Sequence, residues 1–257
     1  MLQLNTRVQG EGPAIILLHG LFGSMDNMGV IARDLAADYQ VVSVDLRNHG
    51  HSPHTPTMTY PDMATDIGAV ADRYQLDQPV LVGHSMGGKV AMQAVTATPA
   101  RYKAVVVGDI APVDYPSRHD QVLAVLHNYR SEGITSRRQA DEQLSSFVAE
   151  PGVRQLLIKS LHRDNDGFFK WRMNAAVLRD SYPVISAAPP LLERQFTGPT
   201  LFVRGETSDY VLPEYEQAIV ASFPQAVLQV VPEAGHWLHV DNPAFFLAFL
   251  REFLAAL

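Results

Sequence analysis

Short apolar runs rich in β-branched residues recur along the chain, and they predict the strands of a sheet. Six runs are nearly continuous in apolar character: Ala14 to Leu18, Val41 to Val44, Val80 to Val82, Ala104 to Val107, Thr200 to Val203 and Val227 to Val231. Strands that are buried on both faces have this continuous pattern, whereas strands with one solvent face alternate. The runs therefore predict a mostly parallel sheet.

The segments between these runs have the spacing of amphipathic helices. Asn27 to Ala37 and Tyr60 to Tyr74 each place their apolar residues on one side of a helix. Two further helices are expected at Met86 to Ala97 and at Pro243 to Leu254, where the proline occupies a favoured first-turn position. Because strand and helix alternate, we expect the α/β class, with a central sheet flanked by helices.

One stretch interrupts this alternation of strand and helix. From about Ala111 to Leu192 no strong strand run appears, and helical patterns take its place. The strand pattern resumes at Thr200, after the Pro189-Pro190 pair. The simplest interpretation is a core formed by residues 1–111 and 193–257 that carries a mostly helical insertion at residues 112–192.

Composition narrows the class of protein. The 257 residues are 47% hydrophobic and 18% charged, which suits a large globular domain with an insertion. Acidic residues outnumber basic ones by 27 to 20, so the net charge of -7 disfavours a nucleic-acid binder. The apolar runs are far shorter than the roughly 20 residues that span a bilayer, and no secretory signal pattern is present. We therefore expect a soluble, cytoplasmic protein without a membrane partner, and the pattern predicts no oligomeric state.

The segment Val80 to Gly88 has the clearest chemical signature. The chain contains no cysteine, so a thiol nucleophile is excluded. A buried strand runs into Gly83-His84-Ser85-Met86-Gly87, and a helix follows at once. Such a tight turn strains the serine backbone, lifts its hydroxyl above the sheet edge and requires glycines on either side. Ser85 is therefore predicted to be a nucleophile, with the Met86 amide as a donor to an oxyanion.

A serine nucleophile needs a base, and the base needs an acid that orients it. His236 lies between the strand Val227 to Val231 and the final helix, where this architecture places its base. His239 begins to enter the helix and is the weaker candidate. Asp109 and Asp209 each follow a core strand, and both preserve the chain order serine, aspartate, histidine. Spacing alone does not choose between these two acids.

A glycine-bearing loop after the first buried strand, His19 to Gly23, is predicted to aim the Leu21 amide at the same oxyanion. Phe22 beside this loop and Trp237 beside the base are candidate substrate-lining residues. The histidines of the loop Asp45 to His54 lack the ligand spacing of zinc enzymes, so we interpret this loop as structural. The predicted chemistry needs no metal ion and no organic cofactor.

Two more side chains near Ser85 are interpreted as structural or solvated. His84 precedes the nucleophile, but neighbouring side chains diverge at such a turn, which favours a structural role. Lys89 could meet an anionic group such as a coenzyme A phosphate, although a solvated helix lysine is the favoured interpretation.

Together these motifs resemble the α/β-hydrolase superfamily over nearly the whole chain. The resemblance rests on His19-Gly20, Asp45-x-Arg47-x-His49-Gly50-x-Ser52, Gly83 to Gly88 and Gly235-His236. More narrowly, the chain looks like the small bacterial esterase and acyl-CoA thioesterase group, which is related to a mitochondrial abhydrolase of animals. That likeness lies in Arg47-Asn48-His49-Gly50, Met86-Gly87-Gly88-Lys89 and Asp109-Ile110-Ala111-Pro112-Val113-Asp114-Tyr115.

The resemblance implies a fold, a reaction and a choice of acid. In that group the acid follows the strand after the nucleophile helix, which favours Asp109 over Asp209, and the insertion is a cap domain. The implied activity is cleavage of small-molecule carboxylic esters or acyl thioesters through an acyl-enzyme. Ser85 excludes the aspartate nucleophile of dehalogenases with this fold. A carbon–carbon bond hydrolase and a non-catalytic ligand-binding protein remain the alternatives.

Overall fold

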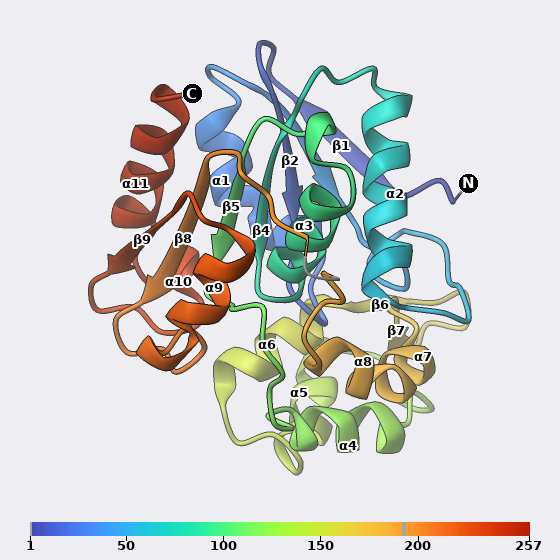
Figure 1. Cartoon of the computed structure of the whole chain (residues 1–257). Coiled ribbons are helices and arrows are strands. Elements are labelled where there is room, and N and C mark those ends of the chain that lie inside the picture. The colour runs from blue at the N-terminus through green and yellow to red at the C-terminus, as the bar shows by residue number, and fades with distance from the viewer. Residues whose placement is uncertain (1, 192–193) are drawn as a thin grey trace.

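The computed structural model describes residues 2–191 and 194–257. A seven-stranded sheet with the strand order β1-β3-β2-β4-β5-β8-β9 lies at the centre (Figure 1). Its strands are β1 (Thr6–Gln9), β2 (Ala14–Leu18), β3 (Gln40–Val44), β4 (Val80–His84), β5 (Val105–Gly108), β8 (Thr200–Gly205) and β9 (Ala226–Val231). Neighbouring strands are parallel except for β1 and β3, which are antiparallel. The predicted α/β class with a mostly parallel sheet is confirmed.

Helices cover both faces of the sheet (Figure 1). On one face α2 (Tyr60–Arg73) packs against α3 (Met86–Ala97), and on the other α1 (Gly29–Leu35) contacts α11 (Pro243–Ala255). The shorter helices of the core are η1 (Met25–Met28), η2 (Pro99–Arg101), η3 (Pro213–Tyr215), α9 (Glu216–Ser222) and α10 (Leu238–Asp241). The predicted helix at Asn27 to Ala37 is thus divided into η1 and α1.

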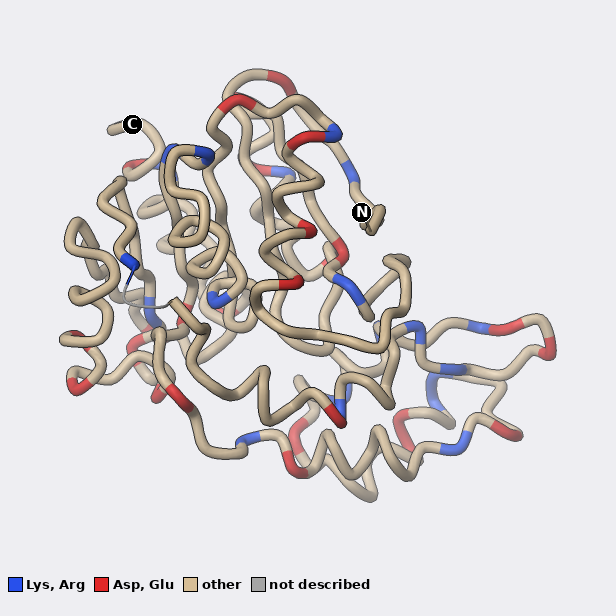
Figure 2. Tube along the Cα trace, turned by 45° about the vertical axis from the view of Figure 1, so that its right-hand side comes forward, with Lys and Arg blue, Asp and Glu red and all other residues tan. Residues whose placement is uncertain are grey.

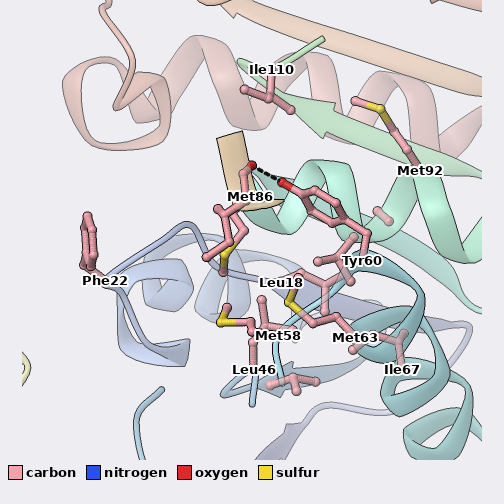
Figure 3. Close-up of a cluster of buried hydrophobic side chains, with 14 of the residues drawn as sticks. Leu18, Phe22, Leu46, Met58, Tyr60, Met63, Ile67, Met86, Met92 and Ile110 are labelled. Carbon is pink, nitrogen blue, oxygen red and sulfur yellow. Dashed lines mark hydrogen bonds between the residues drawn. The ribbon is translucent and has the colours of Figure 1, made fainter. Parts of the chain in front are cut away.

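The buried apolar side chains form two clusters, one on each face of the sheet. Along β2, Ile16 and Leu18 enter one cluster while Ile15 and Leu17 enter the other. This alternation between two buried faces explains why the strand is apolar throughout. The cluster under α2 and α3 surrounds Tyr60 and extends to the helix that follows Ser85 (Figure 3).

Between β5 and β8 the chain forms the insertion. Its helices are α4 (Asp120–Asn128), α5 (Arg137–Ser145), α6 (Pro151–Lys159), α7 (Ala175–Asp180) and α8 (Tyr182–Ser186), and they gather at one end of the sheet (Figure 1). A small antiparallel sheet of β6 (Leu161–Arg163) and β7 (Phe169–Trp171) is an addition to the expected helices. Strands of three residues are too short to give a recognisable run. The predicted boundary at residues 192 and 193 lies outside the described residues.

The two edge strands differ from the pattern expected of them. β1 is polar and partly exposed, because it pairs only with β3 at the margin of the sheet, and its sequence gave no strand signal. β9 has the expected apolar run, yet Val227 and Leu228 are 53% and 48% exposed, because β9 forms the opposite edge. The apolar run of β9 therefore predicted the strand correctly, but the expected burial of both its faces was wrong.

Charged residues of both signs are interspersed along the core and the insertion (Figure 2). Among the described residues, no helix combines the length and the apolar character needed to cross a lipid bilayer.

Candidate active site

Ser85 occupies a strained turn between β4 and α3. Its backbone has φ 53° and ψ −121°, a conformation that non-glycine residues rarely adopt. A Cβ atom at Gly83 would lie 2.2 Å from the Gly87 carbonyl oxygen, and one at Gly87 would lie 2.4 Å from that of Leu18. The glycines of the motif are therefore required by the close approach of the backbone, as the sequence indicates.

Three distant segments bring Ser85, His236 and Asp109 together. The His236 Nε2 atom lies 3.0 Å from the Ser85 hydroxyl oxygen, and its Nδ1 lies 2.7 Å from Oδ2 of Asp109. Because a carboxylate only accepts, Nδ1 carries a proton and Nε2 is left to accept the serine proton. Asp109 follows β5 directly and is fully buried, whereas the His236 side chain is 20% exposed. The arrangement can pass the serine proton to the imidazole.

The Asp109 carboxylate is held by donors on both of its oxygens. The Gly205 amide donates to Oδ1 at 3.0 Å, and the Ser208 hydroxyl donates to Oδ2, which also faces His236. Burial of a carboxylate is tolerated when such donors replace water. The sequence analysis did not predict either donor, although it considered Asp209 in the same segment as a candidate acid.

Asp209, the alternative acid, lies elsewhere. Its side chain is 70% exposed, and its Oδ1 atom accepts from the Arg118 guanidinium at 2.6 Å. None of its described hydrogen bonds or ion pairs reaches His236. Arg118 belongs to the start of the insertion, so Asp209 connects the core to the insertion rather than to the base.

The backbone amides of Leu21 and Met86, near Ser85, donate no hydrogen bond to a described residue. Met86 is the first residue of α3, where the amide has no partner within the helix. The Leu21 amide, in the loop after β2, likewise donates no hydrogen bond to a described residue. The Phe22 amide, in contrast, donates to Nε2 of His49 at 3.2 Å. The amides of Leu21 and Met86 can therefore donate to a bound carbonyl oxygen.

Two buried histidines brace the loop that carries Leu21. His19 donates from Nδ1 to the Gly20 carbonyl and accepts the Leu46 amide at Nε2, at 2.7 and 3.0 Å. Burial lowers the pKa of His19, and burial lowers the pKa of His49 to about 3, so both rings are neutral. This is the structural role expected for the loop containing His49. Among the described residues, no group of three or more histidine, aspartate or glutamate side chains is arranged to hold a metal ion.

His84 supports the base through its backbone. Its Nε2 donates to the His236 carbonyl oxygen at 2.7 Å, and burial holds its pKa well below the usual value. This is the structural role expected from its position beside the nucleophile. The ring centroids of His239 and His84 lie 4.6 Å apart, in an edge-to-face arrangement. His239 is 2% exposed, and burial lowers its pKa to about 4.

A cavity of about 820 Å³ opens at Ser85 and His236. Phe22 and Trp237, the two predicted lining residues, both lie in its wall. The insertion also lines the cavity, through Ser117, Arg118, His119, Asp120, Gln121 and Val122 before and at the start of α4, and through Val148, Glu150, Val153 and Leu156 before and within α6. Sequence reasoning did not single out Arg118 or His119, because their proximity to Ser85 arises only when the insertion folds over the core.

Lys89 is not a solvated helix lysine. It is 1% exposed, and its ammonium group donates to the carbonyl oxygens of Val113, Ser186 and Ala187 at 3.0, 3.1 and 2.6 Å. Its donors are thus directed at the two ends of the insertion rather than at the cavity. Burial lowers its pKa to about 7.

Comparison with known proteins identifies the family. The alpha/beta hydrolase family matches residues 15–249. The chain belongs to this family. This hydrolase is 40% identical to "Esterase YbfF" of Escherichia coli K12, over 98% of the chain and 99% of that protein. It is 41% identical to the mouse "sn-1-specific diacylglycerol lipase ABHD11", over 95% of the chain and 81% of the lipase. The solved structure "Marine microorganism esterase" superposes on the hydrolase with a TM-score of 0.95 at 35% identity, covering 98% of the chain and all of that structure.

Proposed function

We propose that this α/β hydrolase cleaves carboxylic esters, acyl thioesters included, through an acyl-enzyme formed on Ser85. The class of carboxylic ester hydrolase rests on relatives that match nearly the whole chain and are named esterases or lipases. The observation that carries the mechanism is the hydrogen-bonded series from Ser85 through His236 to Asp109, of which Ser85 and His236 line the cavity.

The proposed reaction begins with attack of the Ser85 oxygen on the substrate carbonyl carbon, while Nε2 of His236 takes the serine proton. Asp109 fixes the Nδ1–H tautomer and stabilises the imidazolium that forms. The amides of Leu21 and Met86 stabilise the tetrahedral oxyanion, and loss of one such donor typically costs about 10² to 10³ in rate.

Collapse of the tetrahedral intermediate breaks the bond to the leaving group, which takes the proton from His236. Water then attacks the acyl-enzyme, with His236 again acting as base, and the carboxylic acid departs from Ser85. These steps need only the side chains and amides already described, and their partner is a small acyl ester or thioester.

We also assign the insertion at residues 112–192 as a cap domain over this site. The assignment rests on the cavity, which is lined both by Ser85 of the core and by residues of the insertion. Its volume lies in the range of small-molecule sites, roughly 300 to 1,000 Å³. In this proposal Phe22 and Trp237 line the acyl or leaving-group space.

A substrate panel tests the proposed function. Wild type and Ser85→Ala are compared on p-nitrophenyl esters and acyl-coenzyme A thioesters of increasing acyl length. We expect saturable hydrolysis by the wild type and a loss of more than about 10³ in kcat for the variant. Hydrolysis retained by Ser85→Ala would contradict the nucleophile. No hydrolysis by the wild type at any acyl length would favour the non-catalytic binding protein.

A further inference from the structure

The ring of His236 is covered by a tyrosine that the mechanism does not use. Tyr210 stacks on it with ring centroids 3.8 Å apart and an angle of 21° between the planes. The Arg118 guanidinium lies 4.6 Å from the Tyr210 ring centroid and is also paired with Asp209. A series of contacts therefore runs from the insertion, through Arg118 and Tyr210, to the proposed base.

Tyr210 itself is held firmly by its backbone. Its amide donates to the Ser208 hydroxyl oxygen at 3.2 Å, and its carbonyl accepts from the Tyr115 hydroxyl. The Tyr210 hydroxyl makes no hydrogen bond to a described residue, so the aromatic ring is the part that acts on His236. Three consecutive residues thus contact three different groups: Ser208 contacts Asp109, Asp209 contacts Arg118, and Tyr210 contacts His236.

The position of Arg118 is set by the insertion. Arg118 lies two residues before α4, and its amide donates to the Tyr182 hydroxyl at 3.1 Å, from the start of α8. Its side chain is 22% exposed, so the guanidinium sits at the border between the core and the insertion. A cation over the face of an aromatic ring is attracted by the negative charge density of that face, so this contact links Arg118 to the Tyr210 ring.

A stacked ring supplies a restraint that the two hydrogen bonds of His236 lack. Asp109 binds Nδ1 and Ser85 faces Nε2, and these two atoms lie on opposite sides of the imidazole. Two such bonds still allow the ring to twist about the line that joins the two nitrogens. Contact with the face of the ring opposes that twist. The restraint matters most once Ser85 is acylated, because its hydroxyl then no longer donates to Nε2.

We propose that Ser208-Asp209-Tyr210 is a positioning segment for the base, and that Arg118 couples it to the insertion. Tyr210 and Arg118 are positioning residues, and their main effect falls on hydrolysis of the acyl-enzyme. The inference rests on the proposed function. Asp209 receives a role in it, as the residue that holds Arg118 over Tyr210.

Pre-steady-state and steady-state hydrolysis of p-nitrophenyl butyrate tests the inference. In Tyr210→Leu, kcat falls about 10- to 100-fold because the base is misaligned. Since slow deacylation lowers kcat and KM together, KM also falls and a burst of p-nitrophenol precedes the steady state. Tyr210→Phe keeps the ring and retains the wild-type parameters. A general loss of structure would instead raise KM or lower the amount of active enzyme.

Arg118→Met keeps the alkyl stem of the side chain and carries the test even where Tyr210→Leu does not fold. It shows a smaller loss of kcat with the same fall in KM, and the double variant is no worse than Tyr210→Leu alone. A raised KM with unchanged kcat in Arg118→Met would mean that Arg118 binds substrate and would overturn the coupling. Wild-type kcat in Tyr210→Leu would overturn the inference alone, whereas no hydrolysis by the wild type would overturn the proposed function with it.

Discussion

Four side chains hold His236, and each contacts a different part of the residue. Asp109 accepts from Nδ1, Ser85 faces Nε2, His84 donates to the carbonyl oxygen and Tyr210 covers the ring. A ring restrained at its edges, its backbone and its face has few orientations available. Such preorganisation lowers the cost of reaching the geometry for proton transfer.

Exchange of each candidate acid for asparagine separates their roles. In Asp109→Asn we expect kcat to fall about 10³- to 10⁴-fold, because an amide at this position favours the wrong tautomer of His236. In Asp209→Asn the loss is far smaller, because the Asp209 carboxylate pairs with Arg118 and forms no hydrogen bond or ion pair with His236 among the described residues. The measurement is kcat for p-nitrophenyl butyrate with both variants shown to be folded. Near-normal turnover in Asp109→Asn would overturn the assignment of the acid.

At the scale of elements, the sequence predicted the strands whose burial requires apolar residues at every position. The strands β2, β3, β4, β5 and β8 were predictable because they are buried on both faces and are therefore continuously apolar. β1 was not, because its partly exposed residues carry polar side chains, and β6 and β7 are too short to form a pattern. At the two edges of the sheet the pattern was less informative, because it missed the polar β1 and predicted β9 although that strand is largely exposed.

Some residues of the candidate site have a local sequence pattern that predicts them, and others do not. Ser85 and His236 were predictable because each stands in a local pattern of strand, glycine and helix. Asp109 could not be separated from Asp209 by spacing, because both follow a core strand. Tyr210 and Arg118 lie far apart in the chain and meet only through a tertiary contact, so no local pattern could connect them.

The two ends of the insertion depend on Lys89, which α3 places beneath them. Lys89→Met removes the donor to the carbonyl oxygens of three partly buried residues, and each of these acceptors that water does not reach costs about 1 to 3 kcal/mol. We expect a lower free energy of unfolding in urea and faster proteolysis near residues 113 and 187. Lys103→Met, which replaces an exposed lysine, is the control. Equal stability of the Lys89 variant and the control would contradict this role.

At the scale of the whole molecule, folding keeps many histidines neutral. Burial is the first cause of a lowered pKa for six of them: His19, His49, His84, His119, His162 and His239. The values are about 3 for His49 and about 4 for His119 and His239, against 6.5 in an unfolded chain. Below pH 6.5 the unfolded chain therefore binds protons that the folded chain does not, and acid favours unfolding.

The contribution of these histidines to the free energy of unfolding should therefore be fully present above pH 6.5. It should be lost as the pH falls from about 6.5 towards the folded-state pKa values of about 4 and 3. Each histidine that is charged only when unfolded contributes a slope of about 1.4 kcal/mol per pH unit. Urea unfolding at pH 7, 6 and 5 measures the slope. His49→Gln retains an acceptor for the Phe22 amide, and the slope should become shallower by one histidine. An unchanged slope in this variant would contradict the prediction.

The place at which the insertion joins the sheet has a consequence for evolution. The chain leaves from β5 and returns to β8, and these strands are paired neighbours, with Val105 opposite Thr200. The entropic cost of closing a loop between adjacent strands rises only slowly with its length. Homologous proteins can therefore have a longer, shorter or different insertion beside the cavity while the proposed catalytic residues of the core stay the same. We expect residues such as Arg118, which lies near the start of the insertion and contacts Asp209 and Tyr210, to vary together with their partners in the core.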